Sequence, residues 1–247
     1  MPRHVMLNNV AHKDLRVITR YGSEFGDSTG TALIFPNEFA DLQKEYPIFF
    51  RRDRESGEYQ SVALLGFEKD ENLFLEGDRW NAVHLPAVIA RGPFLIGFQE
   101  RQIDGELRSE PVIHVDMEHP RISNIEGEPV FLPQGGNSPY LDHIATVLRG
   151  IRDGLEISKQ MFAAFTAMDL IESVNVEVKL NKQEMYGLKG LYTISPEKLN
   201  ALDASSLHKL HQMGFLQTAF LIIASHGNVR KLMAMKQRRM RHRAISN

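Results

Sequence analysis

The 247-residue sequence contains no cysteine. That absence excludes disulfides, thiolate nucleophiles and every zinc or iron–sulfur site that depends on cysteine ligands. It also favours a reducing compartment over an oxidising one. Long apolar runs are missing as well, because the longest unbroken one, residues 219–224, is far shorter than the roughly 20 residues that cross a bilayer. We therefore expect no membrane span.

The charge and the N-terminal residues bear on where the protein is located and on whether it binds nucleic acid. Residues 1–18 lack the run of about seven apolar residues found in a secretory signal, so we expect a cytoplasmic protein, with association to the envelope left open. The formal net charge is −2, so attraction to nucleic acid is not expected of the whole molecule. Near the end of the chain, five basic residues occur without acidic neighbours: Lys236, Arg238, Arg239, Arg241 and Arg243. We expect a solvated helix end there, with contact to anionic lipid or nucleic acid as the alternative.

The residue pattern changes character near residue 135. Residues 1–134 contain short strand-like segments and turns, whereas residues 135–247 have helical periodicity interrupted by one strand pair. The fold we expect is α+β, with a mainly antiparallel, β-rich first part and a helical second part that contains one β-hairpin, packed as one compact unit. In the first part, the segments 48–50 and 59–67 flank a polar turn with Gly57, which predicts a hairpin. Further short strands are expected at 15–19, 72–75, 94–98 and 111–116.

The second part has clear helix boundaries. Ser138 and Pro139 form a helix start, with serine as the N-cap and proline at the first helical position. Apolar spacing then continues past Gly154, which predicts two helices or one kinked helix. A hairpin is expected from residues 174–178 and 191–194, and a long final helix over residues 215–239, with Gly227 as the place where it could break.

Several segments form an ordered set along the chain: FPNEFADLQKEYPIFF at 35–50, VALLGFEKDENLF at 62–74, Trp80 with residues 84–86 and 91–94, GLKGLYTISPEKLNAL at 187–202, LHKLHQMGFL at 207–216, and Leu232. Together they resemble the SapC family of bacterial proteins. The family takes its name from a bacterial surface-layer locus. The resemblance implies an accessory protein of the kind often encoded beside outer-membrane nutrient receptors, halogenase-like flavoproteins and cupin-like proteins. It brings no catalytic residue set, and it is not a likeness to the peptide-transport permease of the same name.

His114 and Asp116 form the sharpest candidate for chemistry. The His-x-Asp pattern on a predicted strand places both side chains on one face, as in the facial triad of non-haem iron oxygenases. A third ligand is not evident in the sequence. The alternative is an ordinary polar strand face, which we favour.

The segment from Trp80 to Phe94 is the candidate binding surface. It contains the only tryptophan, His84, Arg91 and Phe94 in a region rich in proline and without periodicity. Tryptophan and arginine often anchor interfaces or stack on sugar rings, although a tryptophan that fills the core is the simpler alternative. The sequence thus favours a non-catalytic binding protein without a cofactor, acting with a protein or glycan partner of an envelope or nutrient-uptake system. A metal-dependent enzyme built on His114 and Asp116 is the second hypothesis, and the oligomeric state is left open.

Overall fold

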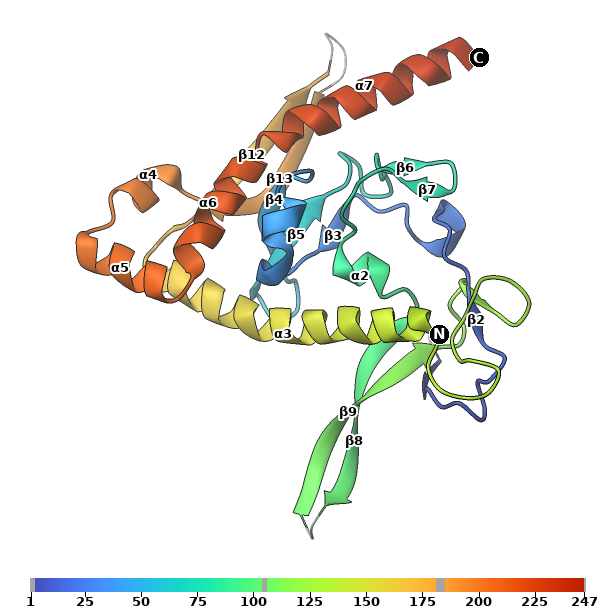
Figure 1. Cartoon of the computed structure of the whole chain (residues 1–247). Helices are drawn as coiled ribbons and strands as arrows, with labels where there is room; N and C mark the ends of the chain where they lie inside the picture. The colour runs from blue at the N-terminus through green and yellow to red at the C-terminus, as the bar shows by residue number, and fades with distance from the viewer. Residues whose placement is uncertain (1–2, 104–105, 181–184, 247) are drawn as a thin grey trace. The chain divides into compact units, whose positions relative to one another are not determined.

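A computed structural model describes residues 3–103, 106–180 and 185–246 of the chain (Figure 1). The chain forms two compact units. Unit 1 consists of Met1–Asp27, Gly77–Arg79 and Ala87–Asp153, and unit 2 of Ser28–Glu76, Trp80–Pro86 and Gly154–Asn247. This partition differs from the expected boundary at 134/135, because the segments 28–76 and 80–86 belong with the helical end of the chain.

Unit 1 is built from short antiparallel sheets. One contains β1 (His4–Met6), β9 (Glu106–Asp116) and β8 (Phe94–Ile103), and β8 and β9 form the long green ribbon of Figure 1. Another contains β10 (Ile122–Ser123), β2 (Arg16–Val17) and β11 (Glu128–Pro129). The expected strands at 94–98 and 111–116 are therefore confirmed, and they pair with each other. The core of this unit is apolar and consists of Leu15, Val17, Phe94, Val115, Val130, Phe131, Leu141, Ile144 and Leu148.

Unit 2 is organised around a five-stranded antiparallel sheet. Its strand order is β12 (Ile171–Lys179), β13 (Met185–Ile194), β4 (Ile48–Arg52), β5 (Tyr59–Leu64) and β3 (Thr31–Leu33). Both expected hairpins are present as β4–β5 and β12–β13. Gly57 has φ 72° in the first turn, a conformation that favours glycine.

The helix α3 (Pro139–Ala167) is continuous and contributes its residues up to 153 to unit 1 and the remainder to unit 2. The expected start is confirmed, since the Ser138 hydroxyl accepts a hydrogen bond from the Leu141 N–H at 3.2 Å. A break at Gly154 does not occur. A Cβ at this position would lie 2.5 Å from Phe35 Cβ, so the glycine serves close packing inside unit 2.

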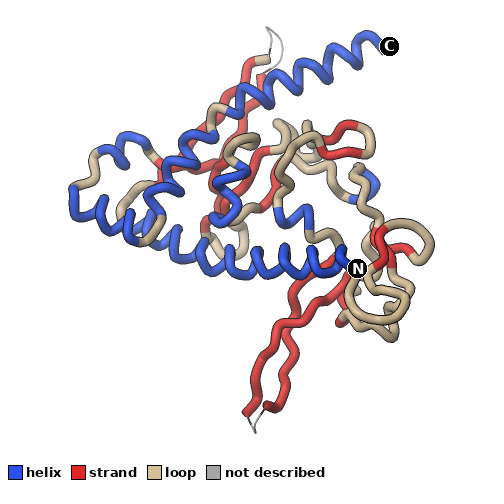
Figure 2. The backbone as a smooth tube through the Cα atoms, viewed as in Figure 1, coloured by secondary structure: helices blue, strands red, loops and turns tan. Residues whose placement is uncertain are grey.

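The helices of unit 2 beyond α3 lie between β3 and β4 and after β13 in the chain. The 3₁₀ turn η2 (Pro36–Glu38) leads into α1 (Phe39–Leu42), which precedes β4. After β13 come α4 (Pro196–Asn200), α5 (Ala204–Gln212), α6 (Phe215–Ser225) and α7 (Asn228–Ser246), shown as helices in Figure 2. The final helix does break at Gly227, as the sequence suggested.

Two local predictions need correction. Residues 72–75 are not a strand, because the Asn72 side-chain oxygen accepts the Phe74 N–H and closes a turn; only Leu75–Glu76 form β6, which pairs with β7 (Arg79–Trp80). The basic end of the chain is not wholly solvated either. Lys236 is 7% exposed and its ammonium lies 2.6 Å from Glu71 and 3.1 Å from Glu68. The side chain of Arg243 lies outside the described residues.

The α+β class predicted from the sequence is confirmed by these antiparallel sheets and helices. Within the described part of the chain, no helix is both long and apolar enough to traverse a bilayer.

Candidate functional site

Trp80 is fixed in place by a chain of hydrogen bonds in unit 2. Its indole N–H donates to the Tyr46 hydroxyl at 2.8 Å, and that hydroxyl donates to the His84 carbonyl at 2.7 Å. Tyr46 itself is fully buried and packs against Phe74, with ring centroids 4.5 Å apart. The Trp80 ring lies nearly parallel to Phe74 at 6.3 Å. The indole is therefore held in one orientation before any partner arrives.

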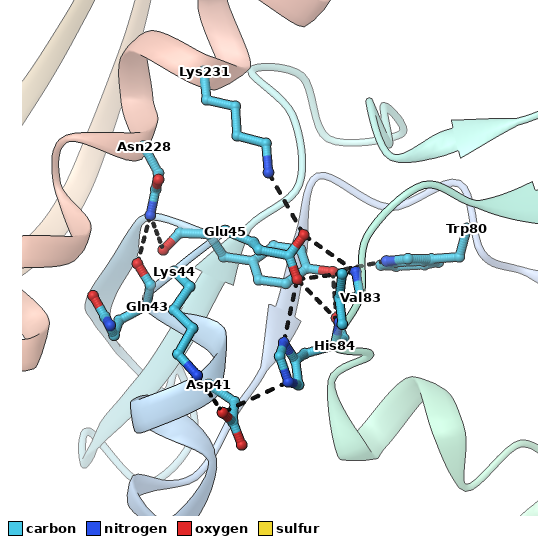
Figure 3. A network of polar contacts seen from close by, with 10 residues as sticks. Asp41, Gln43, Lys44, Glu45, Trp80, Val83, His84, Asn228 and Lys231 are labelled. Carbon is cyan, nitrogen blue, oxygen red and sulfur yellow. Dashed lines mark hydrogen bonds and ion pairs between the residues drawn. The ribbon is translucent and has the colours of Figure 1, made fainter.

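Glu45 anchors the segment that follows Trp80. Its carboxylate accepts the N–H groups of Val83 and His84 at 3.0 Å and lies 3.6 Å from the Lys231 ammonium (Figure 3). Burial alone would raise the pKa of Glu45, but the two backbone donors and the Lys231 charge outweigh it and lower the pKa. The carboxylate thus stays ionised and ties residues 83 and 84 to α7.

The start of α7 is fixed against the residues that precede Pro47. The Asn228 amide donates to the carbonyl oxygens of Gln43 at 2.7 Å and Tyr46 at 3.2 Å (Figure 3). Further along α7, Arg239 donates to the carbonyls of Asn72 and Leu75 at 3.0 and 2.6 Å. These contacts, with the Lys236 ion pairs, hold one face of α7 over the loop that leads to β6.

A cavity of about 680 Å³ lies between these elements, entirely within unit 2. We call it the Trp80 cavity. Its α7 wall carries residues spaced by three, four and seven positions, which is the spacing of one helix face. The lining residues are Glu45, Leu73, Leu75, Glu76, Trp80, Asn81, Ala82, Val83, Lys231, Met235, Arg238, Arg239 and His242.

Positive charge exceeds negative charge around the Trp80 cavity. Lys231 and Glu45 offset each other, and Arg239 is bound by carbonyl oxygens rather than by a carboxylate. Arg238 is exposed and Glu76 is the remaining acid of the lining. An aromatic ring beside two guanidinium groups, with a net surplus of one positive charge in the lining, suits a ligand that combines a flat apolar face with negative charge.

In a comparison with protein families, the model of the SapC family matches residues 7–232 of the chain. The chain belongs to the SapC family. Searches of curated proteins and of solved structures found no match. The family assignment therefore confirms the resemblance seen in the sequence.

The four binding residues predicted from the sequence fall in different units of the SapC chain. Trp80 and His84 lie together in unit 2, where the His84 ring is 3.4 Å from Glu45. Arg91 and Phe94 belong to unit 1. Phe94 is fully buried in the core of that unit, and Arg91 donates to the Phe94 carbonyl at 2.7 Å. Phe94 is therefore a core residue rather than a contact residue.

His114 and Asp116 share one face of β9, as predicted, but the residues around them do not complete a metal site. The His114 ring lies across Gly97 of β8, where a Cβ would be 2.5 Å from Nε2. One Asp116 oxygen accepts the N–H groups of Arg3 and Glu118 at 2.9 and 3.1 Å. Among the described residues, no three histidine or acidic side chains are grouped to hold a metal ion. The facial-triad pattern does not fit this site.

The sequence did not identify Glu45, Tyr46 or the cavity face of α7. Glu45 and Tyr46 follow a short helix inside the segment 35–50 that resembles the SapC family, but that resemblance gives neither residue a role. The sequence does contain a signal for the α7 face, because Lys231, Met235 and Arg238 recur at helical spacing. The many basic residues in that segment made this face hard to recognise.

Proposed function

We propose that this SapC protein is a non-catalytic binding protein that holds an acidic segment of a protein or glycan partner in the Trp80 cavity. The observation that carries the proposal is the Trp80 indole, fixed by Tyr46 and placed beside the basic face of α7. A cavity of about 680 Å³ is within the roughly 300–1,000 Å³ typical of ligand pockets. It suits one or two sugar rings or a few residues of a peptide.

The wider role follows from the family resemblance. SapC proteins resemble accessory components encoded beside outer-membrane nutrient receptors, which makes an envelope or nutrient-uptake system the proposed setting. An acidic sugar is the favoured occupant, because a fixed indole stacks on the apolar face of a sugar ring and guanidinium groups pair with its carboxylate. An acidic peptide segment is the other form that a partner could take.

The only tryptophan of the chain provides a direct assay. Trp80 fluorescence is followed in the whole protein during titration with trigalacturonic acid, with the neutral maltotriose, and with a pentaglutamate peptide. A saturable change with the acidic trisaccharide but not with maltotriose supports the glycan form, and a change with pentaglutamate supports the peptide form. No saturable change with either acidic probe contradicts the proposal.

A further inference from the structure

A second pocket lies within unit 1 and shares no lining residue with the Trp80 cavity. Its volume is about 210 Å³, the space of roughly seven water molecules at their liquid volume of about 30 Å³. We call it the Arg91 pocket. Its lining is mainly polar and consists of His4, Phe25, Gly26, Asp27, Val88, Ile89, Arg91, Gly92, Pro93, Leu95, Asp116, His119 and Arg121.

The two arginines of this pocket have very different surroundings. Arg121 is 5% exposed and has an acidic partner: its guanidinium lies 2.6 Å from Asp27, donates to the Ile18 carbonyl at 2.9 Å, and packs over the Phe25 ring. A buried arginine with such partners has a structural role. Its charge is already paired with the Asp27 carboxylate.

Arg91 is half-buried and lacks an acidic partner among the described residues. It follows α2 (Ala87–Ala90), and within the part of the chain that the structure describes its side chain makes one hydrogen bond, to the Phe94 carbonyl. Burial lowers the pKa of Arg91. A guanidinium has five N–H donors, so most of those on Arg91 remain for a ligand.

A neighbouring histidine supplies a second donor. His119 Nδ1 accepts a hydrogen bond from the backbone N–H of Arg121 at 3.2 Å, which leaves the proton of the neutral ring on Nε2. Burial, and then the charge of Arg121, lower the pKa of His119, so the ring is neutral at pH 7. The two carboxylates of the lining are already engaged, Asp27 by Arg121 and Asp116 by two backbone N–H groups.

We propose that the Arg91 pocket binds a small oxyanion, the carboxylate or phosphate group of a low-molecular-weight compound, through the Arg91 guanidinium and the His119 Nε2–H. The pocket is too small for a polymer, and planar guanidinium donors match the two oxygens of a carboxylate or phosphate. The bound charge removes the cost of a half-buried cation without a counter-ion. This site is independent of the Trp80 cavity and of the function proposed for it.

Calorimetric titration of the whole chain tests the proposal, with inorganic phosphate and citrate as probes and sodium chloride of equal ionic strength as the reference. We expect saturable binding of at least one probe; binding of phosphate alone assigns a phosphoryl ligand, and of citrate alone a carboxylate. Arg91→Met should weaken it at least about tenfold, the loss expected for a charged hydrogen bond. The control Arg149→Met removes an exposed arginine of α3 in the same unit and should leave the affinity unchanged. Binding of neither probe, or equal loss in both variants, overturns the proposal.

A measurement on the unaltered protein covers the case in which Arg91→Met does not fold. Phenylglyoxal modifies accessible arginine side chains, and mass spectrometry locates the modified residues. Whichever probe binds should slow the modification of Arg91 and leave that of Arg149 unchanged. Equal rates at Arg91 with and without both probes contradict the proposal.

Discussion

The indole N–H of Trp80 donates a hydrogen bond to the hydroxyl of Tyr46, a side chain with no exposed surface. The same hydroxyl donates to the His84 carbonyl, so a single buried oxygen connects the two ends of the segment from Trp80 to His84. Tyr46 is therefore a positioning residue for the Trp80 cavity, although it does not line the cavity itself.

Tyr46→Phe keeps the ring and removes this oxygen. The Trp80 N–H and the His84 carbonyl then lose their partner, which should cost about 1–3 kcal/mol of unfolding free energy. Urea unfolding measures the loss, and the emission maximum of Trp80 should shift at the same time. Tyr59→Phe is the matched control, because the Tyr59 hydroxyl accepts only an exposed hydrogen bond from Arg52; its cost should stay below about 1 kcal/mol. Equal costs in both variants would count against the positioning role of Tyr46.

Lys236 connects α7 to the loop before β6. The hydrogen bonds and charges of Glu71 and Glu68 raise its pKa, even though burial by itself lowers it. Lys236→Met should destabilise the protein by about 1–3 kcal/mol, mainly because Glu71 is left buried without a counter-charge. Adding Glu71→Gln should restore part of that loss in chemical denaturation. A double variant less stable than Lys236→Met would contradict this explanation.

Gly154 is the point at which α3 packs against Phe35 and Asn37. Alanine favours a helix by about 1 kcal/mol over glycine, but its Cβ would lie 2.5 Å from Phe35 Cβ and 2.7 Å from Asn37 Oδ1. Overpacking of this kind costs about 1–3 kcal/mol, so Gly154→Ala should be destabilising overall. Exposed Gln160→Ala in the same helix should change stability by less than about 0.5 kcal/mol. A stabilised Gly154→Ala variant would show that the packing is looser than described.

His226 makes stability depend on pH. Its ring stacks on Phe49 at 4.7 Å, and burial lowers its pKa below the usual 6.5. Between these two pKa values the unfolded chain binds more protons than the folded one, so stability falls as the pH drops below about 6.5 and towards the folded-state pKa. In urea unfolding at pH 7.5 and 5.5, His226→Phe should lose less stability than the wild type over this interval. An identical loss would place the titrating group elsewhere.

The fold was more predictable from the sequence than the site. Three features were predicted correctly because each depends on local preferences of the residues themselves. They are the helix start at Ser138 and Pro139, the hairpin turn at Gly57, and the helix break at Gly227. The break predicted at Gly154 was wrong, because this glycine allows the helix to approach Phe35 closely, and Phe35 is more than a hundred positions away in the chain. Lys236 was predicted to be solvated, and this too was wrong because of contacts distant in the sequence: its partners Glu68 and Glu71 lie in a loop far from it in the chain.

The candidate site was predicted in part. Trp80 was identified by its residue type, whereas Glu45 and Tyr46 act through contacts that no local pattern encodes. The proximity of Arg91 to Trp80 in the sequence suggested one surface, but the chain passes between units in that interval. Residue type thus indicated which side chains deserved testing, and only the tertiary contacts indicated which of them act together.

In the proposed function, the α7 face of the Trp80 cavity contacts the partner. Arg238 lines the cavity, whereas Arg241, three positions later on the same helix, is exposed and does not. The direct measurement is the Trp80 fluorescence titration with the acidic probe that binds the wild type, repeated on Arg238→Met and Arg241→Met. We predict that Arg238→Met weakens binding by about tenfold, as for loss of one charged hydrogen bond, and that Arg241→Met binds like the wild type. Equal affinity in the two variants would contradict the account.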